Sequence, residues 1–112
     1  MASPPAVSDL LAEPRRRVTL EEVRSRRDEI LAAGERHGVT RVRVFGSVAR
    51  GDATESSDLD LLVDVAPGRS LLDLASFAIE VQDLMAVFTQ VVTVAGLRER
   101  IRPRVLDEAV PL

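Results

Sequence analysis

The sequence contains no cysteine, tryptophan or tyrosine, and its only aromatic residues are three phenylalanines. The lack of cysteine excludes disulfides and thiolate-bound metals. The lack of tyrosine and tryptophan removes the aromatic side chains on which nucleic-acid bases usually stack. All fifteen basic residues are arginine, yet the formal net charge is −3. A nucleic-acid partner is therefore not expected.

Long apolar runs are also missing. None approaches the ~20 residues of a membrane-spanning helix, and the first residues lack the basic-then-apolar order of a secretory signal. We therefore expect a cytoplasmic protein without membrane contact. The 112 residues fit one small domain.

The chain divides into two parts by composition. Residues 1–17 are small and proline-bearing, which predicts a flexible N-terminal arm. The triplet Arg15–Arg17 that ends this arm is interpreted either as a solvated flank or as a contact for an anion. Residues 18–112 carry the hydrophobic pattern of a folded domain, and a T-x-x-E capping box predicts a helix over residues 19–36.

The rest of the chain alternates strand and helix patterns. Period-two alternation predicts the strands. Residue patterns that resemble a capping box, and the position of a proline, predict where the helices begin or break. The predicted elements are strands at 39–45, 58–65 and 88–94, a helix from Ser70 to about Val87, and a short C-terminal helix beyond a break at Pro103. The order α-β-β-α-β-α predicts an α/β (α+β) fold, with one short mixed sheet packed by helices.

The predicted helix over residues 70–87 is apolar around most of its circumference. One apolar face would be enough for the core of so small a domain. The excess predicts either deep burial within the domain or a surface for a protein partner.

Two aspartates open the second predicted strand. Asp58 and Asp60 are two residues apart, so they share a face of the strand with ~6.5–7 Å between their Cα atoms. Carboxylates at this spacing can hold a divalent cation such as Mg²⁺, which often takes one or two carboxylates and completes its shell with water and phosphate oxygens. The pair is a candidate metal site.

The first strand ends in Gly46-Ser47. Backbone N–H groups at the start of the following short helix can bind an anion, and Gly46 permits close approach. Ser47 adds a hydroxyl donor, and Arg50 could direct its guanidinium to a phosphate. A phosphate site and a metal site on successive strands suit a nucleoside triphosphate with its magnesium.

The stretch "GSVARGDATESSDLD" resembles the G-S-x10-D-x-D signature of polymerase-β-like nucleotidyltransferases, and the chain looks most like their minimal nucleotidyltransferase branch. The resemblance implies that Gly46, Ser47 and Arg50 bind the nucleotide. It implies that Asp58 and Asp60 are catalytic and bind Mg²⁺ or Mn²⁺. The implied reaction moves AMP from ATP to an acceptor hydroxyl and releases pyrophosphate.

One position departs from the family pattern. The third strand has Gln90 where the family usually supplies a third carboxylate, and glutamine cannot accept a proton as a general base. Asp64 lies too far along its strand to replace it, and Asp83 lies on a helix. Whether transfer is retained, or only nucleotide and partner binding, is left open by the sequence.

Proteins that this chain resembles include antitoxins paired with a neighbouring HEPN-type toxin, to which AMP is attached at a tyrosine. The resemblance thus implies an antitoxin adenylyltransferase, with an inactive fold that neutralises its partner by binding as the alternative. A small-molecule transferase that modifies an antibiotic is a second alternative, although the chain is short for an acceptor pocket. A tRNA-modifying transferase is a weaker one. A homodimer and a hetero-complex both stay open.

Overall fold

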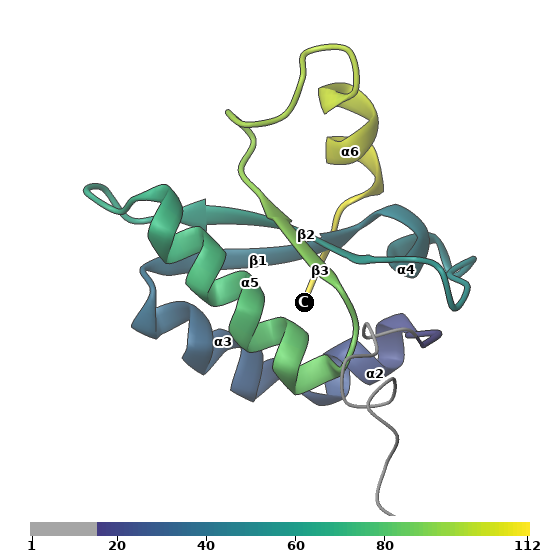
Figure 1. Ribbon diagram of the computed structural model, residues 1–112. Coiled ribbons are helices and arrows are strands. Elements are labelled where there is room, and N and C mark those ends of the chain that lie inside the picture. Colours follow the sequence, from purple (N-terminus) through teal and green to yellow (C-terminus); the bar gives the residue numbers. More distant parts are fainter. Residues whose placement is uncertain (1–15) are drawn as a thin grey trace, which may run out of the picture.

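The computed structural model describes residues 16–112, and its centre is a four-stranded mixed sheet of order β3-β2-β1-β4 (Figure 1). The strands are β1 (Val39–Phe45), β2 (Leu59–Val65), β3 (Thr89–Val92) and β4 (Val110–Pro111). β1 runs antiparallel to both β2 and β4, whereas β2 and β3 are parallel. The expected α+β class, with a short mixed sheet packed by helices, is confirmed.

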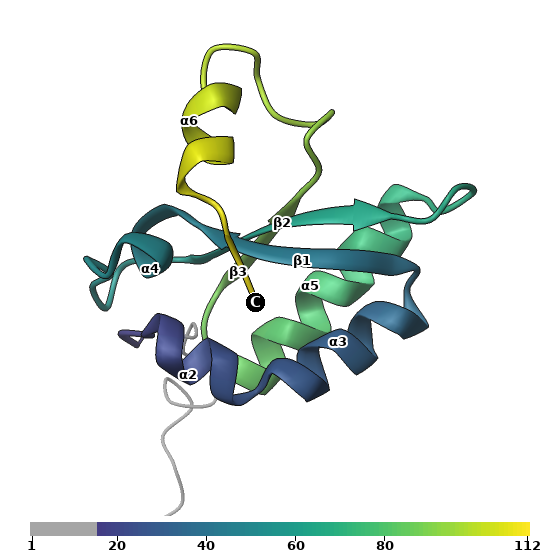
Figure 2. The ribbon, with the colours of Figure 1, turned by 180° about the vertical axis from the view of Figure 1, so that it is seen from behind.

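Helices cover both faces of the sheet. α2 (Leu20–Ser25), α3 (Arg27–Arg36) and α5 (Leu71–Met85) lie on one side, and α6 (Arg102–Glu108) lies on the other, as the view from behind also shows (Figure 2). The five-residue α4 (Gly46–Arg50) directly follows β1. Strand alternation separates the two layers, because successive side chains point to opposite faces.

The main core lies between the sheet and the α2/α3/α5 layer. Alternate residues of β1 and β2 meet apolar residues of the helices there, including Ile30, Val44, Leu61, Phe77 and Val81, each fully buried. A smaller cluster fills the other face, where Leu62 packs with Leu97 and Val105. Leu62 therefore shares a face with Asp60, and that face is the one that α6 covers.

The first helix differs from the expectation. Thr19 caps it as predicted, since its hydroxyl accepts the Glu22 N–H at 3.1 Å. The helical hydrogen bonding is interrupted at Arg26, whose backbone ψ is 19°, so the predicted single helix is two helices. No glycine or proline marks this break, and the side chain of Arg26 pairs with Glu29 at 2.7 Å.

The C-terminus differs as well. Pro103 does not break a helix but occupies the first turn of α6, where its missing N–H costs nothing. The chain does not end in a helix either. Its last residues form β4 on the edge of the sheet, where Pro111 pairs with Arg43.

α5 begins and ends by local rules. Its N-terminus has the predicted capping box, with Ser70 and Asp73 exchanging hydrogen bonds. It ends two residues earlier than expected, because Ala86 takes a left-handed conformation (φ 54°).

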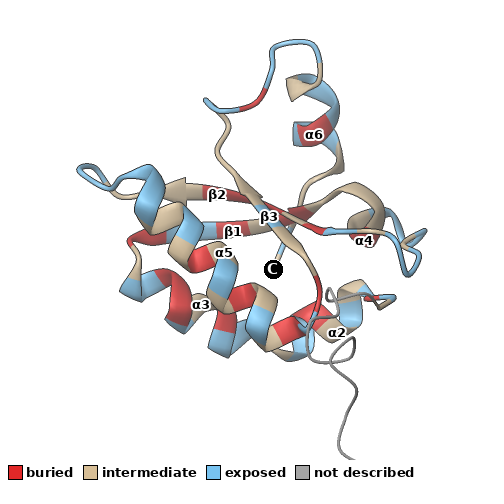
Figure 3. Ribbon diagram, viewed as in Figure 1, coloured by how far each residue is buried: buried red, intermediate tan, exposed pale blue. Residues whose placement is uncertain are grey.

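Part of the apolar surface of α5 is not buried within the domain. Leu71, Leu72 and Ile79 are 83%, 77% and 58% exposed, and the pale blue segments of α5 mark its exposed side (Figure 3). Deep burial is thus wrong for these three positions.

The predicted arm lies mostly outside the described residues, including Arg15. Arg16, at the edge of the described part, is held in place: it donates to the Met85 carbonyl at 2.8 Å and to Glu22 at 2.6 Å. The domain boundary at residue 17 stays a prediction. Among residues 16–112, no helix has the length and apolar character needed to cross a membrane.

Candidate active site at the ends of β1 and β2

The antiparallel pairing of β1 and β2 brings the two halves of the sequence motif together. Phe45, the last residue of β1, pairs with Asp60 near the start of β2. Gly46 follows Phe45, so the predicted phosphate site and the predicted metal site meet at one end of the sheet. Ten residues separate Ser47 from Asp58 in the sequence, and this register places the Gly46-Ser47 turn next to the start of β2.

Gly46 is required by its surroundings. Its backbone has φ 71°, in the left-handed region that favours glycine. A Cβ at this position would collide with Oδ2 of Asp60. The position therefore combines a conformational reason and a steric reason for glycine.

The intervening loop closes on itself. Gly51 (φ 83°) ends α4, and the Ser47 carbonyl accepts the N–H groups of Gly51 and Asp52, both at 3.0 Å. Further along, Thr54 and Ser57 hydrogen-bond each other through backbone and side chain, at 2.9 Å and 3.1 Å. These bonds fold residues 51–57 into a compact connection from α4 to β2.

Asp60 carries the strongest electrostatic perturbation of the site. Partial burial raises the pKa of Asp60 to about 6, with further contributions from the negative charges of Asp58 and Glu108, while Arg50 opposes the shift. No described residue forms an ion pair with Asp58 or Asp60 at 4.0 Å or less. The two carboxylates are thus a concentrated negative charge that a cation would stabilise.

Asp58 directly precedes β2, which begins at Leu59 and not at residue 58 as predicted, and Asp60 lies within it. Together the two carboxylates offer oxygen donors that suit a divalent metal. Within residues 16–112, no group of three or more His, Cys, Asp or Glu side chains is placed to hold an ion. Asp58 and Asp60 would therefore hold it by themselves, with water and phosphate oxygens completing the shell, as is common for Mg²⁺. The chemistry of this donor set suits a hard cation that binds together with a phosphate-bearing substrate.

Gln90 lies beside Asp60. The parallel register of β2 and β3 pairs these two residues, so their side chains leave the sheet on the same face. This is where the family resemblance expects a third carboxylate. The amide supplies a neutral oxygen and no proton-accepting group.

Glu108 is a site residue that the sequence did not indicate. From the C-terminal end of α6, its Oε1 accepts from Arg50 Nη1 at 2.7 Å, and its Oε2 accepts from the Gly46 N–H at 3.3 Å. Arg50 also donates to Asp52 at 3.2 Å. These hydrogen bonds, the one to Glu108 being the larger cause, raise the pKa of Arg50. Glu108 is 62 residues from Gly46 in sequence, so no local pattern could show the contact.

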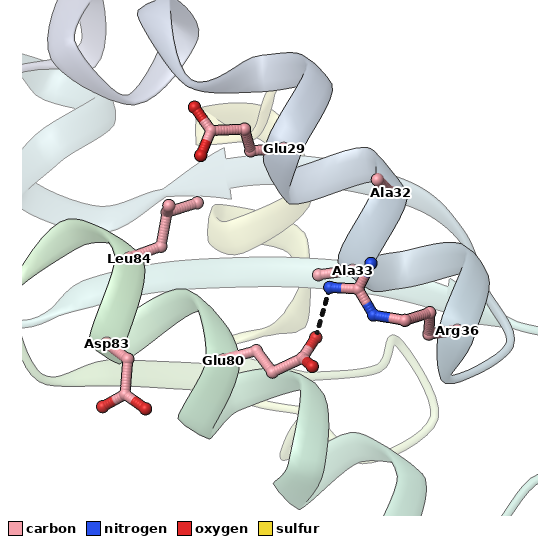
Figure 4. A pocket seen from close by; sticks show the side chains of 7 residues that line it. All are labelled: Glu29, Ala32, Ala33, Arg36, Glu80, Asp83 and Leu84. Atoms are coloured by element: carbon pink, nitrogen blue, oxygen red, sulfur yellow. Dashed lines mark hydrogen bonds and ion pairs between the residues drawn. The ribbon is translucent and has the colours of Figure 1, made fainter.

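A cavity of about 530 Å³ lies elsewhere, between α3 and α5. Its lining is charged, and an ion pair of 3.0 Å joins Arg36 to Glu80 across it (Figure 4). Asp83 comes from α5 and points away from α3 in this view. The cavity is on the side of the sheet that α2, α3 and α5 cover, whereas Asp60 lies on the face that α6 covers (Figure 1).

A profile of the nucleotidyltransferase domain family matches residues 20–112. Among curated proteins, the chain is 38% identical over 98 residues to protein adenylyltransferase MntA of Thermococcus cleftensis, covering 83% of this chain and 95% of that protein. A Methanocaldococcus jannaschii protein, provisionally named a protein adenylyltransferase, is 39% identical over 75 residues, or 67% of this chain and 81% of the relative.

Solved structures agree with the family. One described as a provisional minimal nucleotidyltransferase is 50% identical and has a TM-score of 0.74, covering 85% of this chain and 97% of that one. A chain from a toxin–antitoxin complex with AMP-PNP has a TM-score of 0.63 at 15% identity, covering 75% of this chain and 69% of that one, and supports the fold alone. The chain belongs to the nucleotidyltransferase domain family and is a transferase of its minimal type.

Proposed function

We propose that the protein transfers AMP from ATP to a hydroxyl group of a protein partner and acts in this way as an antitoxin. The observation that carries the proposal is the contact between Gly46 and Asp60, which joins a phosphate-binding turn to a pair of carboxylates. The near full-length similarity to protein adenylyltransferase MntA supports a protein acceptor. We propose further that the partner is a HEPN-type toxin and that the acceptor hydroxyl belongs to a tyrosine of this toxin.

Each site residue has a role in this reaction. The Gly46 N–H, the Ser47 hydroxyl and Arg50 bind the phosphates, and Asp58 and Asp60 hold Mg²⁺ or Mn²⁺. A divalent cation held by these two carboxylates would supply neutralisation of the negative charge that develops during the displacement. The acceptor oxygen forms a bond to the α-phosphorus, the bond to the bridging oxygen breaks, and pyrophosphate leaves with that electron pair.

The proton of the acceptor hydroxyl needs a destination. Gln90 cannot take it, so it passes to another acceptor: water, a base on the partner or an ionised carboxylate of the site. We therefore expect transfer to be slower than in a site with a third carboxylate. The position of Gln90 next to Asp60 also favours a second candidate function, a fold that neutralises its partner by binding alone.

Co-expression with the protein encoded by the neighbouring gene separates the two functions. The partner's intact mass is measured after co-expression with wild type, Asp60→Asn and Asp64→Asn. Asp64 is a matched control, because it lies on the same strand, is 46% exposed and contacts only Arg43 at 3.9 Å among the ion pairs of the described residues.

AMP transfer predicts that the partner's mass increases by a whole number of AMP units with wild type and Asp64→Asn, and does not increase with Asp60→Asn. An unmodified partner that co-purifies with wild type and with both variants would instead support neutralisation by binding. A neighbour that is neither modified nor bound would contradict the antitoxin role for that pair.

A further inference from the structure

The carboxylate of Glu108 occupies the groups that would bind a phosphate. One oxygen accepts the Gly46 N–H at 3.3 Å and the other accepts from Arg50 at 2.7 Å. A backbone N–H together with an arginine guanidinium is a typical binding arrangement for an anionic oxygen pair. A carboxylate of the protein itself is bound there.

This carboxylate also adds negative charge close to Asp60. Its side chain is only 18% exposed, and its negative charge is one of those that raise the pKa of Asp60. Glu108, Asp58 and Asp60 therefore face one small region from two elements. A triphosphate would add more negative charge to the same region, so it cannot share the donors with Glu108.

We propose that Glu108 is an internal competitor for the nucleotide, which must leave the Gly46 N–H and Arg50 before a phosphate can bind them. This inference rests on the proposed function. Its physical basis is that the Gly46 N–H and Nη1 of Arg50, which donate to Glu108, cannot donate to a phosphate at the same time. Glu108 thereby lowers the affinity for nucleotide and keeps the guanidinium of Arg50 paired when no nucleotide is bound.

The competing interpretation is that Glu108 positions Arg50. In that case the carboxylate stays in place when phosphate binds, and its loss lets the guanidinium swing away. The two interpretations predict opposite changes in affinity when Glu108 loses its charge. A binding measurement with a matched control therefore distinguishes them.

The experiment measures dissociation constants by calorimetry for wild type, Glu108→Gln and Asp107→Asn. Asp107 precedes Glu108 on α6 and is exposed. Its substitution by asparagine removes the same formal charge as Glu108→Gln. The probes are Mg²⁺ with AMP-PNP, Mg²⁺ with pyrophosphate, and adenosine. Glu108→Gln is expected to bind AMP-PNP and pyrophosphate about tenfold more tightly, the effect of one hydrogen bond to a charged group. Adenosine affinity should not change, and Asp107→Asn should resemble wild type.

Equal or weaker pyrophosphate binding by Glu108→Gln, with measurable binding by wild type, would overturn the competitor and leave the proposed function standing. Failure of every variant to bind AMP-PNP would contradict the proposed function itself, and the inference with it. If Glu108→Gln does not fold, an NMR titration of the wild-type protein still tests the displacement of Glu108. Adding Mg²⁺ with pyrophosphate should shift the NMR signals of the Gly46 amide and the Glu108 carboxyl carbon together, and an unmoved Glu108 signal would refute displacement.

Discussion

Replacing Asp60 by asparagine is expected to stabilise the protein at neutral pH while it removes transferase activity. The wild-type carboxyl has a pKa of about 6 in the folded chain, against an ordinary value of 3.8. A raised pKa means that folding favours the protonated form. The ionised form therefore opposes folding, and asparagine, which has nearly the shape of the protonated acid, does not.

The sign and the pH window follow from this shift. Between about pH 4 and pH 6 the folded state binds more protons than the unfolded state, so the free energy of unfolding falls as pH rises. The penalty is absent below the unfolded pKa and complete above the folded one. The shift from 3.8 to about 6 corresponds to at most about 3 kcal/mol. Because Asp60 is only partly buried, solvent screening reduces the expected effect to about 1 kcal/mol.

The assay is urea unfolding of wild type and Asp60→Asn at pH 4 and pH 7.5, without divalent cations. We expect equal stability at pH 4 and a gain of about 1 kcal/mol for the variant at pH 7.5, or roughly 4 °C in melting temperature. Adding Mg²⁺ at pH 7.5 should stabilise wild type and leave the variant unchanged.

A variant that is less stable than wild type at pH 7.5 would refute the reasoning. So would a stability difference that does not change between the two pH values, because the argument depends on ionisation of this carboxyl. Asp64→Asn serves as the control for removing a charge from the same strand, and its effect should be small at both pH values.

Three further predictions concern other positions. Gly46→Ala should abolish binding of Mg²⁺ with AMP-PNP and destabilise the fold by about 2 kcal/mol. The control Gly51→Ala has a similar φ but nothing near its Cβ, so it should cost about 1 kcal/mol and keep binding. Binding retained by Gly46→Ala in calorimetry would argue against a phosphate site at Gly46. Gln90→Asp should tighten Mn²⁺ binding about tenfold by adding a charged oxygen donor, and unchanged affinity would mean that this position does not face the ion. Leu71→Gln combined with Leu72→Gln should change unfolding free energy by less than about 0.5 kcal/mol but weaken capture of the partner, and undiminished capture would exclude this surface.

Local patterns in the sequence account for most of the fold. Alternation predicted β1 with its observed bounds and β2 to within one residue at its start, and the Ser70–Asp73 box predicted the start of α5. Both are effects of neighbouring residues. The break at Arg26 has no such signal, and neither has β4, a two-residue edge strand that only the rest of the sheet makes possible.

The site follows the same division. The residues of the G-S-x10-D-x-D motif were found because they are close in sequence, and their contact follows from the antiparallel pairing of two predicted strands. Glu108 was missed because it reaches Gly46 and Arg50 from α6 through tertiary packing alone. The significance of Leu71 and Leu72 was likewise undecided, since an apolar pattern does not distinguish a core face from an exposed one.

The central claim is that this chain transfers the adenylyl group of ATP, which carries the α-phosphate, despite Gln90. Incubation of purified protein, its partner and Mg²⁺ with ATP labelled at the α- or the γ-phosphate tests it most directly. The account predicts partner labelling from α-labelled ATP alone, lost in Asp60→Asn and kept in Asp64→Asn. Labelling from γ-labelled ATP, or none from α-labelled ATP by a protein that binds nucleotide and partner, would contradict it.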